Sequence, residues 1–179
     1  YLIALPQENS PIINLAWTGY IGFPDGVGGY TLELLDENNR IVRAIPVTGN
    51  TYTERNPSEE LQELRYRVRV TSGNGSVTSY SNTVVVQQPL QVHIPNAFTP
   101  NGDGLNDVLE VKGRFIKSFS IKVYNSMGQL VYTSDDRNTS WDGTYQGKPM
   151  PAGAYAYEVQ VTAQNGKTQQ RMGTVTLLR

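Results

Sequence analysis

The residues best suited to binding chemistry lie in one polar loop near the middle of the chain, "IPNAFTPNGDGLNDVLEV", at residues 94–111. Its oxygen-bearing side chains recur at the spacing of an EF-hand-like or dockerin-like calcium loop, with Thr99 in the first position and Gly104 at the sharp turn. The calcium ligands in that register would be Thr99, Asn101, Asp103, the carbonyl of Leu105, Asp107 and Glu110. The spacing therefore suits a hard, oxygen-preferring cation, and calcium is a candidate cofactor.

The same loop can also be interpreted as a purely structural turn, which is the interpretation we favour. The residues that define it are Pro95, Asn96, Phe98, Thr99, Pro100, Asn101, Gly102, Asp103, Gly104, Asn106 and Asp107. Asn and Asp side chains bond their own nearby backbone, and Gly102 and Gly104 can supply positive φ angles. Two features favour the turn: Thr99 is neutral where a calcium loop normally starts with Asp, and "DVLEV" alternates like a strand instead of starting a helix. Calcium stays the alternative, and no cofactor is required.

No set of residues forms a catalytic constellation. His93 is the only histidine, so we expect a packed or solvated strand residue there rather than part of a Ser-His-Asp triad. Asp135, Asp136 and Asp142 could act as the paired carboxylates of a glycoside hydrolase only if a cleft held them about 5 to 10 Å apart. A polar loop before Trp141 is the simpler interpretation, with Trp141 a core indole followed by a tight turn. The sequence therefore predicts a protein that is not an enzyme.

Composition indicates a β-rich chain of two domains. Its 179 residues suffice for two small domains, each with a core, and 17 glycines and 11 tyrosines suit strands and turns better than helices. A net charge of -1 gives no field to attract nucleic acid, and no run approaches the roughly 18 apolar residues of a transmembrane segment. Cysteine is absent, which excludes disulfides and thiolate metal sites. The chain starts at Tyr1 without a methionine or an apolar signal segment, so we expect it to be part of a longer protein.

Alternating apolar and polar residues dominate the first half of the chain. Apolar and polar side chains alternate clearly in residues 30–34 and 65–70, which are therefore expected to be strands. The segment 65–70 places Arg65, Arg67 and Arg69 on one face, and carboxylates such as Glu33 are expected as their partners on a neighbouring strand. Further strands are expected at 13–17, 41–45 and 77–86, with a hairpin turn at 72–76. Roughly seven short strands in about 90 residues are typical of a sandwich. An early Trp and a Gly-Asn-Gly hairpin make this half resemble a fibronectin type III or Ig-like domain.

A second set of strands follows a break at residues 87–91, where Pro89 cannot donate to a central sheet. Strands are expected at 107–112, 119–124 and 130–133, then at 155–162, with a turn at 163–168 and a last strand at 171–179. The sequence thus predicts an all-β protein of two tandem antiparallel β-sandwich (Ig-like) domains. Their predicted boundaries are 1–88 and 89–179.

Four blocks in fixed order carry a specific resemblance: "IPNAFTPNGDGLND", "YNSMGQLVY" (124–132), "WDGTYQGKPMPAGAYAYEV" (141–159) and "GTVTLLR" (173–179). Together they resemble the gliding-motility-associated C-terminal domain, which is the type B sorting domain of the type IX secretion system. The similarity covers about residues 92–179.

The resemblance implies a C-terminal secretion and surface-sorting signal. The partners it implies are the outer-membrane shuttle and translocon of the type IX secretion system and a dedicated outer-membrane β-barrel. The implied location is secreted or at the cell surface, after passage through the periplasm and outer membrane. The segment expected to be recognised is Gly173, Thr174, Val175, Thr176, Leu177, Leu178 and Arg179. The alternative is a calcium-stabilised adhesive tandem β-sandwich that binds glycan or protein at the cell surface.

Overall fold

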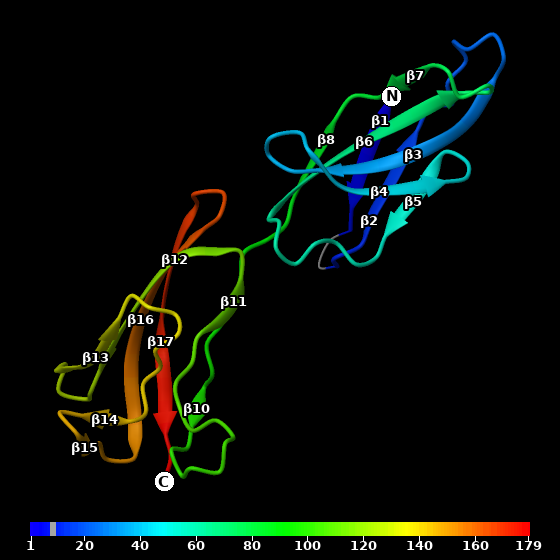
Figure 1. Ribbon diagram of the computed structural model, residues 1–179. Helices are drawn as coiled ribbons and strands as arrows, with labels where there is room; N and C mark the ends of the chain where they lie inside the picture. The colour runs from blue at the N-terminus through cyan, green and yellow to red at the C-terminus, as the bar shows by residue number, and fades with distance from the viewer. Residues whose placement is uncertain (8–9) are drawn as a thin grey trace. The chain divides into compact units, whose positions relative to one another are not determined.

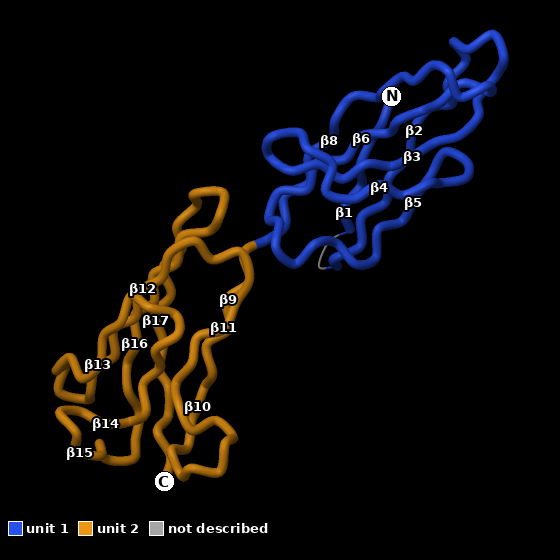
Figure 2. Tube along the Cα trace, in the orientation of Figure 1, with its two compact units in different colours: residues 1–89 blue, residues 90–179 orange. Residues whose placement is uncertain are grey.

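The computed structural model describes residues 1–7 and 10–179, which form two compact units, residues 1–89 and 90–179 (Figure 2). The units meet between residues 89 and 90, one residue after the boundary that the sequence predicts between residues 88 and 89. Every regular element in the described residues is a strand, which confirms the all-β class. In this part of the chain no helix is long and apolar enough to cross a membrane.

Unit 1, residues 1–89, is a sandwich of two antiparallel sheets (Figure 1). Its strands are β1 (Leu2–Pro6), β2 (Ile13–Trp17), β3 (Val27–Leu35), β4 (Ile41–Val47), β5 (Thr51–Glu54), β6 (Glu63–Ser72), β7 (Thr78–Tyr80) and β8 (Val84–Gln87). One sheet has the order β1-β2-β5 and the other the order β4-β3-β6-β7, with β8 also pairing with β6. Buried side chains from both sheets, among them Leu15, Leu32 and Tyr66, form one core.

The single strand predicted at 77–86 is wrong, because the chain leaves the sheet between β7 and β8. Two polar side chains cause the interruption. The Ser81 hydroxyl accepts a hydrogen bond from the Val68 N–H at 2.9 Å. The Asn82 side chain accepts from the Leu2 N–H at 2.8 Å and donates to the Leu2 carbonyl at 3.0 Å. These side chains make hydrogen bonds that backbone groups would make in a continuous strand. The alternation of apolar residues alone therefore could not locate the break.

The arginines of β6 form ion pairs, as the sequence predicts. Glu33 on β3 is buried and accepts from the Arg67 Nε at 2.7 Å and from the Arg69 Nε at 3.1 Å. Arg65 contacts the partly exposed Glu63 at 2.5 Å instead. The arginine face therefore has a structural explanation, in which one buried carboxylate serves two guanidinium groups.

We expect Glu33→Gln to destabilise unit 1 by roughly 2 kcal/mol, because it removes the charge from a buried carboxylate that two arginines share. Glu63→Gln is the matched control and should cost less than about 1 kcal/mol, since the Glu63 side chain is 36% exposed whereas that of Glu33 is buried. Urea unfolding followed through NMR resonances of unit 1 would measure both changes. Equal losses for the two variants would contradict the special role of Glu33.

Unit 2, residues 90–179, is a sandwich of unequal layers (Figure 1). Its strands are β9 (Gln91–His93), β10 (Ala97–Phe98), β11 (Lys112–Arg114), β12 (Ile116–Tyr124), β13 (Leu130–Ser134), β14 (Thr144–Tyr145), β15 (Lys148–Pro149), β16 (Gly153–Ala163) and β17 (Thr168–Leu177). The main sheet has the order β10-β17-β16-β12-β13, and β9–β11 and β14–β15 form two small ladders. Pairing is antiparallel except between β10 and β17, which run parallel.

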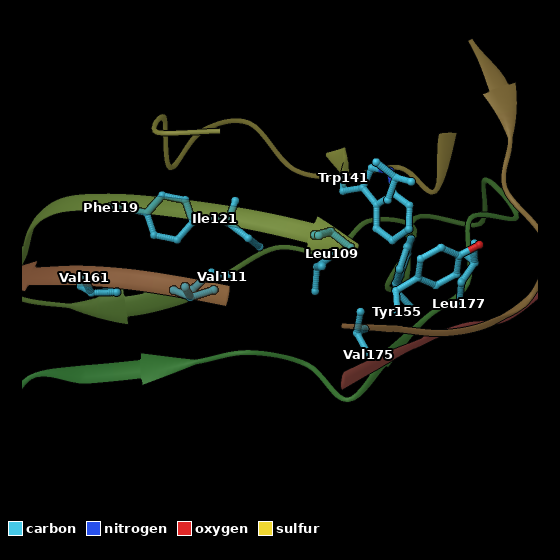
Figure 3. Close-up of a cluster of buried hydrophobic side chains, with 13 residues drawn as sticks. Leu109, Val111, Phe119, Ile121, Trp141, Tyr155, Val161, Val175 and Leu177 are labelled. Carbon is cyan, nitrogen blue, oxygen red and sulfur yellow. The ribbon is translucent and has the colours of Figure 1, made fainter. Parts of the chain in front are cut away.

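The strand predicted at 107–112 is wrong. Leu109 forms only an isolated bridge with Trp141, and β11 begins at Lys112. Leu109 and Val111 are nevertheless both buried in the core of unit 2, as Figure 3 shows. The alternation of apolar and polar residues in this segment therefore indicates which side chains are buried. It does not indicate a strand, because only one bridge joins the segment to a neighbour.

The last strand lies close to its predicted position. β17 pairs with β16 over its whole length, from Thr168 opposite Thr162 to Leu177 opposite Gly153. Its other side pairs with β10 only at Thr176 and Leu177. The C-terminal end of the chain is thus held between two strands.

Candidate functional site

The Asp107 carboxylate organises the polar loop between β10 and β11. One carboxylate oxygen accepts from the N–H groups of Asn101 at 3.0 Å and Gly102 at 2.7 Å, and the other accepts from the Gly104 N–H at 2.8 Å. These hydrogen bonds, led by that from Gly102, lower the pKa of Asp107 because they stabilise its ionised form. One side chain therefore fixes the loop backbone.

Local side-chain bonds complete the loop. Asp103 accepts from the Leu105 N–H at 2.7 Å, and Asn101 accepts from the Asp103 N–H at 3.1 Å. Gly102 and Gly104 have φ angles of 77° and 84°, so the predicted need for positive φ is confirmed. These are the contacts that the structural-turn interpretation requires.

Four of the predicted calcium ligands, Asn101, Asp103, Asp107 and Glu110, are already engaged with other groups. Both Asp107 oxygens face backbone amides, and the Glu110 carboxylate lies 3.3 Å from the Lys112 ammonium. Within residues 1–7 and 10–179, no group of three or more His, Cys, Asp or Glu side chains is placed to hold a metal ion. Calcium therefore remains a prediction that rests on the spacing of the oxygens.

The ends of the loop are anchored in the sheet and the core. The Thr99 N–H donates to the Asn106 carbonyl at 2.7 Å, which closes the loop, while Phe98 is fully buried before it. The Asn96 carbonyl accepts from the Thr176 N–H of β17 at 2.9 Å. Pro95 and Pro100 are half-buried on either side of β10. The loop is consequently a rigid extension of the strand that pairs with the C-terminal strand.

The buried core around Trp141 joins the four sequence blocks in space. Its ring lies 5.4 Å from that of Phe98, 6.4 Å from that of Tyr132 and 4.9 Å from that of Tyr155, measured between centroids. Its indole N–H donates to the Thr144 carbonyl at 2.8 Å. Figure 3 shows the indole among the buried side chains of unit 2. The prediction of a core indole followed by a turn is confirmed.

The fourth block, residues 173–179, is held by the segment that follows Trp141. A Cβ on Gly143 would lie 3.0 Å from a methyl group of Leu177, so the turn packs directly on β17. The Arg179 guanidinium donates to the Met150 carbonyl at 3.0 Å and lies 3.5 Å from the Gly143 carbonyl. Arg179 is exposed, and sequence reasoning gave no signal for these carbonyl contacts.

The segment expected to be recognised is only partly accessible. Val175 and Leu177 are fully buried, and Gly173 lies under the Tyr157 ring, whose hydroxyl oxygen would be 2.5 Å from an added Cβ. The members that remain exposed are Thr174, Thr176, Leu178 and Arg179. A partner that meets the folded unit can therefore contact alternate residues of this segment.

The other candidates have ordinary roles. His93 is an exposed residue of β9. The Asp136 carboxylate accepts from the Asn138 N–H at 2.9 Å, and that of Asp142 accepts from the Thr144 N–H at 2.9 Å. Asp135 is exposed in the same polar loop as Asp136. Asp136 and Asp142 thus shape turns, as the simpler interpretation predicts.

Comparison with known proteins identifies unit 2. Residues 92–177 match the family model described as the CHU_C type IX secretion signal domain. The predicted resemblance to a type IX sorting domain is therefore confirmed for these residues, which make up most of unit 2. None of the curated proteins matches the chain in sequence.

Two solved structures show distant likeness. Dimeric latent PorU from Porphyromonas gingivalis has a TM-score of 0.33 and 10% identity, covering 99% of this chain and 20% of that one. The BSP domain of a biofilm associated protein has a TM-score of 0.30 and 16% identity, covering 94% of this chain and 27% of that one. The chain spans about a fifth and about a quarter of their lengths, and such low TM-scores carry no argument about function.

The Asp107 interactions predict a pH-dependent loop. Because the folded pKa of Asp107 lies below its unfolded value of about 3.9, the carboxylate contributes stability above that value and loses it as pH falls through the lower folded pKa. Amide signals of Gly102 and Gly104 should therefore shift together in an acid NMR titration. In Asp107→Asn that shift should vanish and both amides should exchange faster. Asp103→Asn is the control and should leave the Gly104 amide protected; equal exchange in both variants would contradict the central role of Asp107.

The calcium hypothesis can be tested separately. If calcium binds, it should raise the unfolding temperature of unit 2 relative to a chelator, because ligands of the folded state stabilise it by mass action. Asp103→Ala should abolish the rise, whereas Asp136→Ala, which removes an aspartate from a turn outside the loop, should retain it. Identical calorimetric curves in calcium and in chelator would leave only the structural turn.

Proposed function

We propose that unit 2 is the address by which the type IX secretion machinery exports a longer protein, and that unit 1 is an Ig-like or fibronectin-like spacer. The match of residues 92–177 to the secretion signal family carries this proposal, since a signal of this kind implies interaction with that machinery and export to the surface or the medium. The family is a class of signals and not of enzymes, and we assign no catalytic residue to unit 2.

We further propose that recognition occurs at the end of unit 2 that holds the C-terminus. Figure 1 shows the C-terminus, the loop between β10 and β11, and the β14–β15 hairpin at this end, while the turn between β16 and β17 lies at the opposite end. Large apolar side chains are exposed in these segments, namely Leu178 at 47% and Leu105 at 73%. Exposed apolar side chains held on a rigid backbone are suited to contact with a partner.

The open side of β17 offers a second mode of contact. Because β10 covers only Thr176 and Leu177, the backbone of residues 168–174 has no strand partner on that side among the described residues. Such an edge can accept a strand from another protein. The partners we propose for these surfaces are the outer-membrane shuttle, the translocon and a dedicated outer-membrane β-barrel protein.

An export assay tests the proposal. Residues 90–179, fused behind a periplasm-directed reporter in a cell that has this secretion system and the cognate partner, should place the reporter outside the outer membrane. Unit 2 has its own core, so its export should not require unit 1. A reporter that stays in the periplasm with all components present would overturn the sorting assignment for this unit.

Reversing the charge of Arg179 tests whether the C-terminus is recognised without disturbing the fold. Arg179→Glu should reduce export several-fold while the fusion stays folded, because an exposed side chain contributes little to the core. Arg171→Glu is the matched control, since Arg171 is also exposed on β17 and donates to a carbonyl, that of Val92, at 2.9 Å. Equal export of both folded variants would show that the terminus is not read. Removal of residues 173–179 is less informative, because it also deletes the buried Val175 and Leu177.

A further inference from the structure

Unit 1 contains a partly open cavity of about 80 Å³, lined by residues of β2, β3, β6 and β7 and by the segment that follows β2, which includes Tyr20. Its apolar wall comes from Val68 and Val70, which are buried. The other lining residues include the aromatic residues Trp17, Tyr20, Tyr30 and Tyr80. This cavity belongs to unit 1 alone and is separate from the export signal of unit 2.

Trp17 has a hydrogen-bond donor without an acceptor at this cavity. The side chain is only 7% exposed, yet its indole N–H has no partner among the described residues. Buried tryptophan N–H groups normally find an acceptor, as Trp141 does in the Thr144 carbonyl at 2.8 Å. Trp17 therefore lines the cavity with a donor that a ligand oxygen could satisfy once neighbouring side chains move, because the indole nitrogen has almost no accessible surface in this conformation.

The tyrosines supply exposed ring surface beside this donor. Tyr20 is 36% exposed and packs on the Phe23 ring, 4.5 Å away between centroids, and Tyr80 is 51% exposed, so each ring leaves part of its surface open to a ligand. The Tyr30 hydroxyl accepts from the Tyr20 N–H at 2.9 Å and has no acceptor for its own proton among the described residues. The Arg67 guanidinium lies over the Tyr80 ring, 4.5 Å from its centroid, and favours one orientation of that ring. The cavity thus combines ring faces with donors.

We propose that this cavity binds a neutral carbohydrate, with one edge of a sugar ring and its hydroxyl groups inside and the ring face against an exposed tyrosine. Sugar hydroxyls and ring oxygens can accept from the Trp17 N–H and the Tyr30 hydroxyl, while the C–H face of the ring packs on the electron-rich face of an aromatic side chain. The Ser79 hydroxyl, which also lines the cavity, can donate and accept. No acidic or basic side chain lines it, which favours a neutral ligand.

Cavity size decides how the ligand enters. A cavity of about 150 Å³ can hold a whole benzene ring, and this one is only about half that size, so we expect it to admit only an edge of a six-membered ring. A polyproline peptide, in contrast, needs a groove that spans several residues at about 3.1 Å each. The compact shape therefore favours a sugar over such a peptide.

The two indole N–H signals of the full chain provide the test in a nitrogen–proton NMR spectrum. Cellohexaose, maltohexaose and xylohexaose are the probes, and a polyproline peptide is the competing ligand. At least one sugar should shift the Trp17 signal saturably, with the Trp141 signal unchanged because its N–H already has an acceptor. No saturable Trp17 shift with any sugar would overturn the proposal, as would a shift with the peptide alone or equal shifts of both indoles.

Variants assign the shift to the cavity. Tyr20→Ala and Tyr80→Ala should each weaken binding by about tenfold, the loss expected when a stacked ring is removed. Tyr145→Ala in unit 2 is the control and should leave affinity unchanged. Unaltered affinity in both cavity variants, with the remaining unit 1 resonances in place, would overturn the assignment. Export of unit 2 alone is a separate readout, so failure of either proposal can be told from failure of the other.

Discussion

The burial of the Trp141 indole is the constraint on which unit 2 depends. Phe98 before the polar loop, Tyr132 on β13 and Tyr155 on β16 all reach this one ring, and the Leu109 backbone pairs with that of Trp141 in both directions. Those residues come from segments far apart in the chain, so the ring is enclosed only when the segments have assembled together. The four sequence blocks are therefore also the parts of one packing arrangement, the core of unit 2.

The same arrangement makes one end of unit 2 rigid. The polar loop starts directly after buried Phe98 and ends directly before buried Leu109, and between them the Asp107 carboxylate holds the backbone. The turn after Trp141 packs on Leu177 and supplies a carbonyl next to Arg179. Loop, turn and C-terminus are thus positioned by contacts with each other. A surface fixed in this way loses little conformational entropy on binding, which is an advantage for a signal that must be recognised by a partner.

The sequence predicts those features that depend on periodicity or on turn chemistry. Alternation located β6 and most of β17, and the Asn, Asp and Gly residues of the polar loop indicated a turn that the structure contains. The prediction of one strand at 77–86 failed because the Asn82 side chain replaces a backbone hydrogen-bond partner between β7 and β8. The prediction of a strand at 107–112 failed because burial alternates around Leu109 without a neighbouring strand. The Arg179 contacts and the aromatic cavity of unit 1 depend on long-range packing, which no local pattern reveals.

The buried positions of β17 restrict how a C-terminal signal can be read. Val175 and Leu177 have no exposed surface, so a partner that contacts them must first unfold the end of the sheet, at the cost of the core around Trp141. A partner that binds the folded unit instead meets Thr174, Thr176, Leu178 and Arg179, together with the open backbone of the earlier part of the strand. The second route requires no loss of packing. The apolar pattern of the last strand is then explained by folding, which leaves the alternate, exposed positions and the end that holds them for the recognition that we propose.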